Sequence, residues 1–428
     1  MAVAALVGTM LCLCALGMPL VFSVLGACFV TLTIFRPALP LDVMAQFFVN
    51  GMDHYALLAV AFFFLAGELM NAGGITQRLV AFANSLVGHI RGGLAHVNIV
   101  SSMLFAGISG SAVADTAAIG SVLIPSMKKA GYSAPFSAAV TEASSVVGPI
   151  IPPSIPMIVF AVLAEVSVGK MFVAGIMPGV LVGLSLMAIA YVISRRRGYP
   201  REENLSLRRV VHSGIRAAVP LVAPIIIVGG VLGGVFTATE AGAVAVAYAF
   251  VAGRFVLREL SYEDCWKALI RSAHGTATVL VIIGACTLFA WIVADLQVSQ
   301  RVADIMFAIS REPWIVLLML NIFFLLVGLF IDPLPALIIL VPIFFPIALE
   351  IGVDPIHFGV MIVLNLLIGL CTPPVGFLIY MSASIADTQP EKVVKESLPF
   401  LAVLVAVLLL ITYVPAFTLT LPNLFFDN

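Results

Sequence analysis

Long apolar stretches separated by short polar links dominate this sequence. A helix needs about 20 apolar residues to cross the hydrocarbon core of a bilayer. Residues 2–35 as one helix would be about 50 Å long, so we expect a break at Gly17-Met18-Pro19. Ten stretches are therefore predicted to cross the membrane: 2–17, 19–35, 54–72, 134–165, 171–194, 216–235, 238–257, 272–294, 356–386 and 397–420.

The composition indicates whether such a chain is surrounded by water or by lipid. Of its 428 residues, 62% are hydrophobic and 10% are charged, whereas soluble domains carry about 25% charged residues. The predicted fold class is an all-α polytopic membrane protein surrounded by lipid. The net charge of −1 argues against nucleic acid as a partner. No CxxC pair is present, and we read all six cysteines as apolar residues without a metal or disulfide: Cys12, Cys14, Cys28, Cys265, Cys286 and Cys371.

Two further apolar stretches, 92–126 and 313–349, are long enough for helical hairpins. Each is interrupted near its middle, at 107–111 and at 328–333, by glycine with serine or proline. Irregular backbone at membrane depth is tolerated only where it is buried in protein or lines a cavity. We therefore predict two re-entrant hairpins in addition to about ten transmembrane helices.

The basic residues give the orientation. With this topology, 17 of the 21 lysines and arginines fall on one side, which the positive-inside rule makes cytoplasmic. Both chain termini are then expected in the periplasm. The count is the same for re-entrant hairpins and for hairpins that cross fully, so it fixes orientation and not hairpin depth.

An internal repeat is the strongest signal in the chain. Residues 107–154 align without gaps on 328–375, at an offset of 221, and six of the ten glycines and prolines in 107–153 meet their own kind. The two copies have opposite predicted orientations, which is typical of secondary transporters. We predict a first inverted repeat over 1–194, a cytoplasmic basic linker over 195–215 and a second inverted repeat over 216–428. The helices expected to be broken are 134–165 and 356–386.

Each half thus has two interruptions, one in its hairpin and one in its broken helix. Proline frees backbone carbonyls and glycine allows close approach. Freed carbonyls and hydroxyls are hard oxygen ligands suited to Na⁺, and helix N-termini favour a carboxylate. The pattern predicts one Na⁺ per half with an anionic substrate between them, and no other cofactor.

Few ionisable residues lie within the apolar segments, where charges are costly and mark functional candidates. Asp332 is the best ligand candidate, because it occupies the repeat position of Ser111 beside a hairpin tip. Asp115 follows the Ser111 tip by one helical turn. We expect it either to bind an ion directly or to accept a hydrogen bond from a residue that does.

Other polar residues in these segments have structural interpretations. Glu68 and Glu240 lie close to segment ends and are read as capping or interface residues. His357 is expected to be structural. Three asparagines are expected to tie helices together by hydrogen bonds: Asn98, Asn321 and Asn365.

Several motifs resemble the large membrane subunit of tripartite ATP-independent periplasmic (TRAP) transporters, the DctM-like family. These are Ser109 to Gly120, Gly148 to Ser154, Phe236 to Ala241, His357-Phe358-Gly359 and Thr372 to Gly376. They cover nearly the whole chain in order. Ala238 departs from the family, which usually has proline there, and this affects only the local turn.

The resemblance implies an elevator-type Na⁺ symporter of the bacterial inner membrane that imports dicarboxylates, sialic acids or other small carboxylates. It also implies two partners, a small four-helix membrane subunit and a periplasmic substrate-binding protein. Carried over by position, one Na⁺ site uses Ser109, Gly110, Ser111 and Gly148, and the other uses Gly328, Asp332, Gly369 and Thr372. Pro153, Ser154 and Pro374 are then expected to face the substrate.

Three other functions compete with this one. A stand-alone Na⁺/carboxylate symporter would work without a binding protein. A channel would differ from a carrier in lacking saturable turnover that demands a Na⁺ gradient. Gly107 to Gly110 also fits the GxSG pattern of an intramembrane serine protease, which needs a histidine within reach of Ser109. His212 and His274 are expected at the basic face, and His89 and His96 near the hairpin base. Only His357 is a partial candidate, and it lies near the opposite face, so we do not expect an enzyme.

Overall fold

The computed structural model describes residues 1–37, 40–201 and 205–426, and the regular structure in these ranges is entirely helical. The first half contains α1 (Ala2–Ala15), α2 (Leu20–Phe35), α3 (Asp42–Met52), η1 (Tyr55–Leu57), α4 (Leu58–Ala72), α5 (Ile75–Val87), α6 (Gly93–Ser109), α7 (Ala112–Lys129), α8 (Ala134–Ser145), α9 (Ile155–Leu163) and α10 (Val168–Arg197).

The second half has a similar series. It contains α11 (Leu207–Leu232), α12 (Ala238–Val251), η2 (Ala252–Val256), α13 (Tyr262–Asp295), α14 (Val298–Ile309), α15 (Pro313–Gly328), α16 (Pro333–Glu350), α17 (Pro355–Gly369), α18 (Phe377–Ala386), α19 (Pro390–Tyr413) and α20 (Ala416–Phe426). α7 and α16 begin 221 residues apart, as do α8 and α17.

The helices have the lengths and composition of membrane spans. Within the described ranges, seven are long and apolar enough to cross a bilayer: η1 with α4, α10, α11, α12 with η2, α13, α16 and α19. Shorter apolar helices, among them α1, α2, α6 and α17, complete the set. The predicted all-helical polytopic fold is confirmed, and so is the break between α1 and α2.

Two boundaries differ from the sequence prediction. The crossing expected at 397–420 corresponds to α19, but its C-terminal boundary is wrong, because α19 ends at Tyr413 and α20 begins after Pro415, which has no amide hydrogen to continue the helix. Both ends of the linker expected at 195–215 are helical, since α10 runs to Arg197 and α11 begins at Leu207. Residues 202–204 of that linker lie outside the described ranges.

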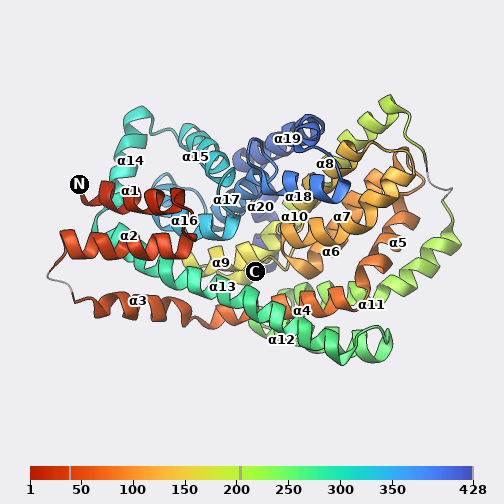
Figure 1. Ribbon diagram of the computed structural model, residues 1–428, viewed down its shortest axis with the longest axis horizontal. Coiled ribbons are helices and arrows are strands. Elements are labelled where there is room, and N and C mark those ends of the chain that lie inside the picture. Colours follow the sequence, from red (N-terminus) through yellow and green to blue (C-terminus); the bar gives the residue numbers. More distant parts are fainter. Residues whose placement is uncertain (38–39, 202–204, 427–428) are drawn as a thin grey trace.

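The sequence prediction also placed no helix at α3, α5 or α14. These helices have 11, 13 and 12 residues, so they are too short to cross a bilayer and were not found by a search for long apolar stretches. In Figure 1, α5 and α14 lie near opposite ends of the molecule. The hairpins and broken helices occupy the middle and upper part, and α1 to α4 with α11 to α13 run along the left and lower edges.

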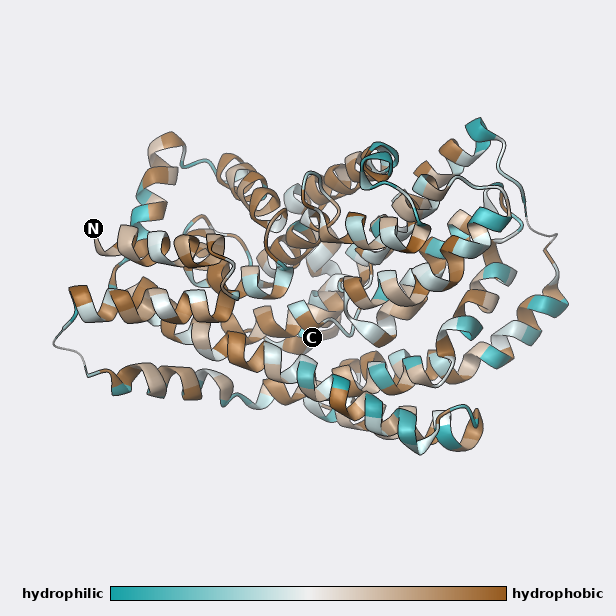
Figure 2. Cartoon of the chain, in the orientation of Figure 1, coloured by the Kyte–Doolittle hydropathy of each residue, from teal (hydrophilic) through white to brown (hydrophobic). Residues whose placement is uncertain are grey.

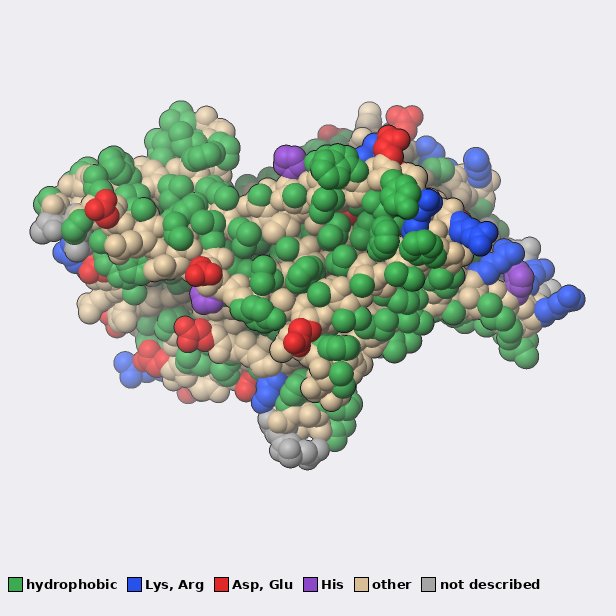
Figure 3. Space-filling view, turned by 90° about the horizontal axis from the view of Figure 1, so that it is seen from below, with side chains coloured by type: hydrophobic (Ala, Val, Ile, Leu, Met, Phe, Trp, Pro, Cys, Tyr) green, Lys and Arg blue, Asp and Glu red, His purple; other side chains and the backbone are tan. Residues whose placement is uncertain are grey.

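Hydropathy and charge are distributed along the long axis. Figure 2 shows hydrophobic residues along most of α1, α2 and α15, and hydrophilic ones at the turn after α12 and at the connection between α10 and α11. In Figure 3, lysine and arginine gather at one end of the face that is shown, and hydrophobic side chains cover its middle. Such a surface suits a lipid environment with one basic end.

Candidate substrate and ion site

The two hairpins turn at tips with well-defined caps. α6 ends at Ser109, Gly110 takes a left-handed φ of +58°, and α7 follows, a conformation that glycine adopts without steric cost. The Ala114 amide donates to the Ser111 side chain at 3.4 Å. In the second hairpin the Leu334 amide donates to Asp332 at 3.1 Å, which caps α16. Serine and aspartate are preferred in this position because they accept from unpaired amides.

The broken helices are interrupted beside these tips. α8 ends at Ser145 and α9 begins at Ile155, while α17 ends at Gly369 and α18 begins at Phe377. Each gap contains a Pro-Pro pair with a cis peptide bond, at 152–153 and at 373–374. Ser154 caps α9 by accepting from the Met157 amide at 3.2 Å, and its hydroxyl donates to the Pro149 carbonyl.

A small cavity of about 50 Å³ joins the two hairpin tips. The first residues of α7, α9 and α16 border it together with Phe64, Gly110, Ser111, Pro149, Asp332, Leu367 and Leu370. Three helix N-termini therefore point their partial positive charge toward one space, which favours an anion. The cavity can hold a few waters or an ion, and it is far smaller than the roughly 300 Å³ of ordinary small-molecule pockets.

The structure brings the first set of predicted ion ligands together. A Cβ added to Gly148 would lie 3.8 Å from the Ser111 carbonyl oxygen and 3.7 Å from the Asp115 Cβ. The Ser109 hydroxyl donates to the same Ser111 carbonyl at 3.4 Å. Ser109, Ser111 and Asp115 come from the first hairpin, and Gly148 comes from the interruption of the first broken helix. The sequence analysis expected these two elements to share a site.

Asp115 is the most unusual residue in this set. Its side chain is completely buried, and neither carboxylate oxygen makes a hydrogen bond of normal geometry to the described residues. The hydroxyls of Ser102 and Ser145 lie next to it. Buried carboxylates are normally paired or coordinate a metal, so this oxygen-rich environment fits a hard cation such as Na⁺.

The second set is only partly brought together. Gly328 and Gly369 are in direct backbone contact, because a Cβ on Gly369 would lie 2.5 Å from the Gly328 Cα. The Thr372 hydroxyl donates to the Ile368 carbonyl at 2.8 Å. Asp332 is exposed and lines the cavity with Gly110 and Ser111 of the first half. Of the residues expected to face the substrate, Pro374 is exposed, whereas Pro153 and Ser154 are buried.

Some polar residues near the site were missed by the sequence reasoning. Ser102 and Ser145 approach Asp115, and Thr116 carries a buried hydroxyl without a partner among the described residues. The Ser101-Ser102 and Ser144-Ser145 pairs were the available signal, since adjacent hydroxyls in apolar helices are unusual.

The asparagines tie helices together, as predicted. Asn98 of α6 donates to Thr141 at 2.7 Å and accepts from Ser144 at 3.1 Å, which joins the first hairpin to α8. Asn365 of α17 donates to Asn321 of α15 at 2.7 Å in the second half. The structural interpretation of these side chains is confirmed.

The remaining ionisable residues have structural partners. Glu240 completes a capping box with Thr237, and Glu68 forms an ion pair with Arg271 at 2.7 Å. The His357 ring hydrogen-bonds Thr418 and the Thr412 carbonyl. Buried Glu142 accepts from Ser382 and Ser397, so it links α8 to α18 and α19. The His357 ring is engaged elsewhere, and among the described residues no histidine hydrogen-bonds the Ser109 hydroxyl, as protease chemistry would require.

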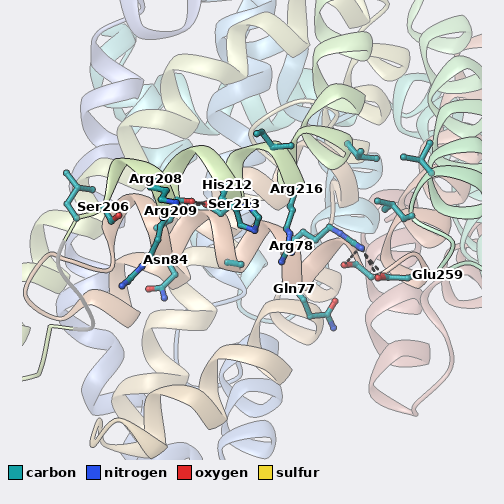
Figure 4. Close-up of a pocket in the computed structure, with 18 of the residues that line it drawn as sticks. Gln77, Arg78, Asn84, Ser206, Arg208, Arg209, His212, Ser213, Arg216 and Glu259 are labelled. Atoms are coloured by element: carbon teal, nitrogen blue, oxygen red, sulfur yellow. Dashed lines mark hydrogen bonds and ion pairs between the residues drawn. The ribbon is translucent and has the colours of Figure 1, made fainter.

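A much larger cleft, of about 1270 Å³, lies elsewhere and shares no lining residue with the tip cavity. It runs between α5 and α11 and is lined by basic side chains (Figure 4). Its size alone does not make it the transport site, since the three helix N-termini meet at the smaller cavity and the buried Asp115 lies one helical turn from Ser111, which lines that cavity.

Comparison with known proteins connects this geometry to a family. Residues 7–417 match the family described as the tripartite ATP-independent periplasmic transporter, DctM component. The chain belongs to this DctM family. A DctM component is one part of a multi-component transporter, which makes the chain a multi-pass inner-membrane transport protein and not an enzyme.

Individual relatives agree with the DctM assignment. The chain is 42% identical over 409 residues to the sialic acid TRAP transporter large permease protein of Vibrio cholerae, with 96% of each chain covered. It is 41% identical to the C4-dicarboxylate TRAP transporter large permease protein of Pseudomonas aeruginosa, with 92% of each covered. Among solved structures, the Alcanivorax borkumensis YdaH transporter has the same fold, with a TM-score of 0.61 at 15% identity over 87% of this chain and 88% of that one.

Proposed function

We propose that this DctM component is the translocating subunit of a Na⁺-coupled TRAP transporter that imports small organic anions. The observation that carries the proposal is the meeting of three helix N-termini at the cavity between the hairpin tips, with the unpaired carboxylate of Asp115 one helical turn along α7 from Ser111. An anion and a cation are each favoured there by a different feature, and symport requires both.

The substrate class follows from the positive ends of the helices. Backbone amides at the starts of α7, α9 and α16 recognise a carboxylate through charge and hydrogen bonds. The similar transporters named above are for sialic acid and C4-dicarboxylates, and both substrates carry carboxylates. We propose the same class here. Since about 50 Å³ is too small for either, the tips must separate for the substrate to bind.

The coupling ion is proposed from the oxygen ligands. The first Na⁺ would lie among Ser109, Gly110, Ser111 and Gly148, with Asp115 supplying negative charge. The second would use the close backbone approach of Gly328 and Gly369, with Asp332 and Thr372 nearby in the chain. A bound cation next to the helix N-termini would neutralise Asp115 and raise the affinity for the anion.

The remaining elements give the proposed mechanism and partners. The hairpins and broken helices would form a transport domain that moves as an elevator against the other helices. The basic end would be cytoplasmic and both termini periplasmic, because 17 of 21 basic residues fall on one side of the predicted topology. A small membrane subunit and a periplasmic binding protein would complete the tripartite system.

Uptake by reconstituted liposomes tests the proposal. The chain is inserted with its small membrane subunit, and a binding protein loaded with radiolabelled sialic acid or a C4-dicarboxylate is added outside. We expect saturable uptake with an inward Na⁺ gradient and little with K⁺. Uptake of equal rate in Na⁺ and K⁺ would refute Na⁺ coupling, and uptake without the binding protein would identify a stand-alone symporter.

A residue-level test uses two aspartates. Asp332→Ala should weaken Na⁺-dependent uptake while leaving expression intact, since Asp332 lines the tip cavity. Asp304→Ala, on the exposed surface of α14, is the matched control and should transport normally. Unchanged Na⁺ dependence in the Asp332 variant would remove this residue from the site.

A further inference from the structure

The basic cleft between α5 and α11 has no role in the proposed transport cycle. Its volume is about 1270 Å³, and the turn between α12 and α13 closes one side. Figure 4 shows Arg208, Arg209, His212 and Arg216 extending from α11 toward α5. Arg208, His212 and Arg216 are four residues apart, so they lie along one face of the helix.

Among the described residues that line this cleft, basic side chains outnumber acidic ones. Glu259 is the only acidic one of these described lining residues, and both of its carboxylate oxygens already accept from Arg78, at 2.9 and 2.7 Å. Arg208 and Arg216 make no ion pair with any described residue. Guanidinium groups gathered in a concave space favour an incoming phosphate, which they bind in a bidentate manner.

The walls of the cleft are held in place without a ligand. The hydroxyls of Ser85 on α5 and Ser213 on α11 hydrogen-bond at 2.7 Å. Gly74, the residue just before α5, has a φ of +69°, and a Cβ there would overlap a Glu259 carboxylate oxygen. Glycine therefore permits the Arg78–Glu259 pair, which fixes α5 against the α12–α13 turn.

Apolar residues at the rim distinguish the class of ligand. Leu205, Ile215 and Val256 all line the cleft and are 61%, 68% and 61% exposed. A small soluble anion would use the arginines and leave this rim in water. A phospholipid would use both, because its phosphate pairs with the guanidinium groups while its acyl chains cover the apolar rim. The volume also exceeds the upper range of about 1,000 Å³ for ordinary small-molecule pockets.

We propose that this cleft binds the phosphate headgroup of an anionic phospholipid, with Arg208 and Arg216 as its principal partners. The lipid would join α5 to α11 at the basic end of the molecule. The site is separate from the tip cavity, so it stands independently of the transported substrate and the coupling ion.

Native mass spectrometry of the purified full-length chain in detergent tests this site. The probes are phosphatidylglycerol, phosphatidylcholine and inorganic phosphate. The parent should retain phosphatidylglycerol in preference to phosphatidylcholine, and the double variant Arg208→Gln/Arg216→Gln should lose about tenfold or more of that preference. Arg195→Gln/Arg196→Gln, which removes two exposed arginines at the same end of the molecule outside the cleft, should keep it.

Two further measurements make the result decisive. Arg208→Lys/Arg216→Lys keeps the charge without the bidentate geometry and should keep part of the preference that the glutamine variant loses, which separates lost binding from lost folding. Equal phosphatidylglycerol retention by the parent and the glutamine variant would overturn the proposal. Complete displacement of the lipid by millimolar inorganic phosphate would also overturn it, since the site would then be one for soluble anions.

Discussion

Asn365 donates its side-chain amide to the Asn321 side-chain oxygen at 2.7 Å and to the Asn321 carbonyl at 3.1 Å, which fastens the second broken helix to the second hairpin. Asn321 in turn donates to Thr412 of α19 at 3.2 Å. In the first half, Asn98 makes the corresponding connection between α6 and α8. Each hairpin is therefore tied to the broken helix of its own half.

Truncating either asparagine should destabilise the protein, and the two losses should not be additive. Asn321→Ala and Asn365→Ala are each expected to cost about 1 kcal/mol, with a coupling of about 0.6 to 1.7 kcal/mol in a double-mutant cycle. The measurement is unfolding of the parent, both single variants and the double variant in mixed micelles. Strictly additive losses would show that the two side chains do not stabilise each other.

The contact between Gly328 and Gly369 should not tolerate a methyl group. A Cβ on Gly369 would lie 2.5 Å from the Gly328 Cα and 2.7 Å from its carbonyl oxygen. We expect Gly369→Ala to cost about 1–3 kcal/mol and to reduce uptake, because backbone atoms must move apart. Gly229→Ala is the control, since no atom lies within 4 Å of its added Cβ. Equal thermal stability and uptake of the two variants would contradict the observed packing.

Asp115 gives a test of the ion site that does not need transport. If Na⁺ binds beside this unpaired carboxylate, NaCl should raise the thermal midpoint of the parent relative to KCl by mass action. Asp115→Asn should lose that difference while its midpoint in KCl stays the same or rises, because an unpaired buried charge has been removed. An undiminished Na⁺ effect in the variant would place the ion elsewhere.

The ion pair between Arg78 and Glu259 should make stability depend on pH. The hydrogen bonds from Arg78 lower the pKa of the Glu259 carboxyl below its usual range. Since the folded-state pKa is the lower one, the stabilisation is complete above the unfolded pKa and is lost as pH falls through the folded value. The side chains are 22% and 46% exposed, so we expect less than about 1 kcal/mol.

The measurement for this pair compares the parent with Glu259→Gln from pH 7 downward. The parent should be slightly more stable near neutrality, and the two curves should converge once Glu259 is protonated. A stability difference that persists at the lowest pH would assign the effect to packing and not to charge. High salt at pH 7 should shrink the difference as well, because the pair is partly exposed.

Particular residues show how far local sequence signals reach. The hairpin tips could be predicted from Gly110, Ser111 and Pro333. Glycine, a capping hydroxyl and an N-terminal proline have local conformational effects that hold in any fold. The amphipathic helices α5 and α14 were missed since they are too short to cross a membrane. The crossing predicted at 397–420 extends too far toward the C-terminus, because the break at Pro415 lies inside an otherwise apolar stretch.

The sequence by itself determined the lipid environment, most of the helices and the internal repeat of this DctM component, because hydrophobicity, capping and proline chemistry act over a few residues. Only the tertiary structure decided which tips share a space. Asp332 was expected to belong to an ion site within its own half, yet it lines a cavity with Gly110 and Ser111 of the other half. Likewise, the approach of Arg208 and Arg216 to α5 follows from the packing of helices about 130 residues apart in the chain. Such contacts depend on how whole helices pack, and no local pattern in either segment encodes them.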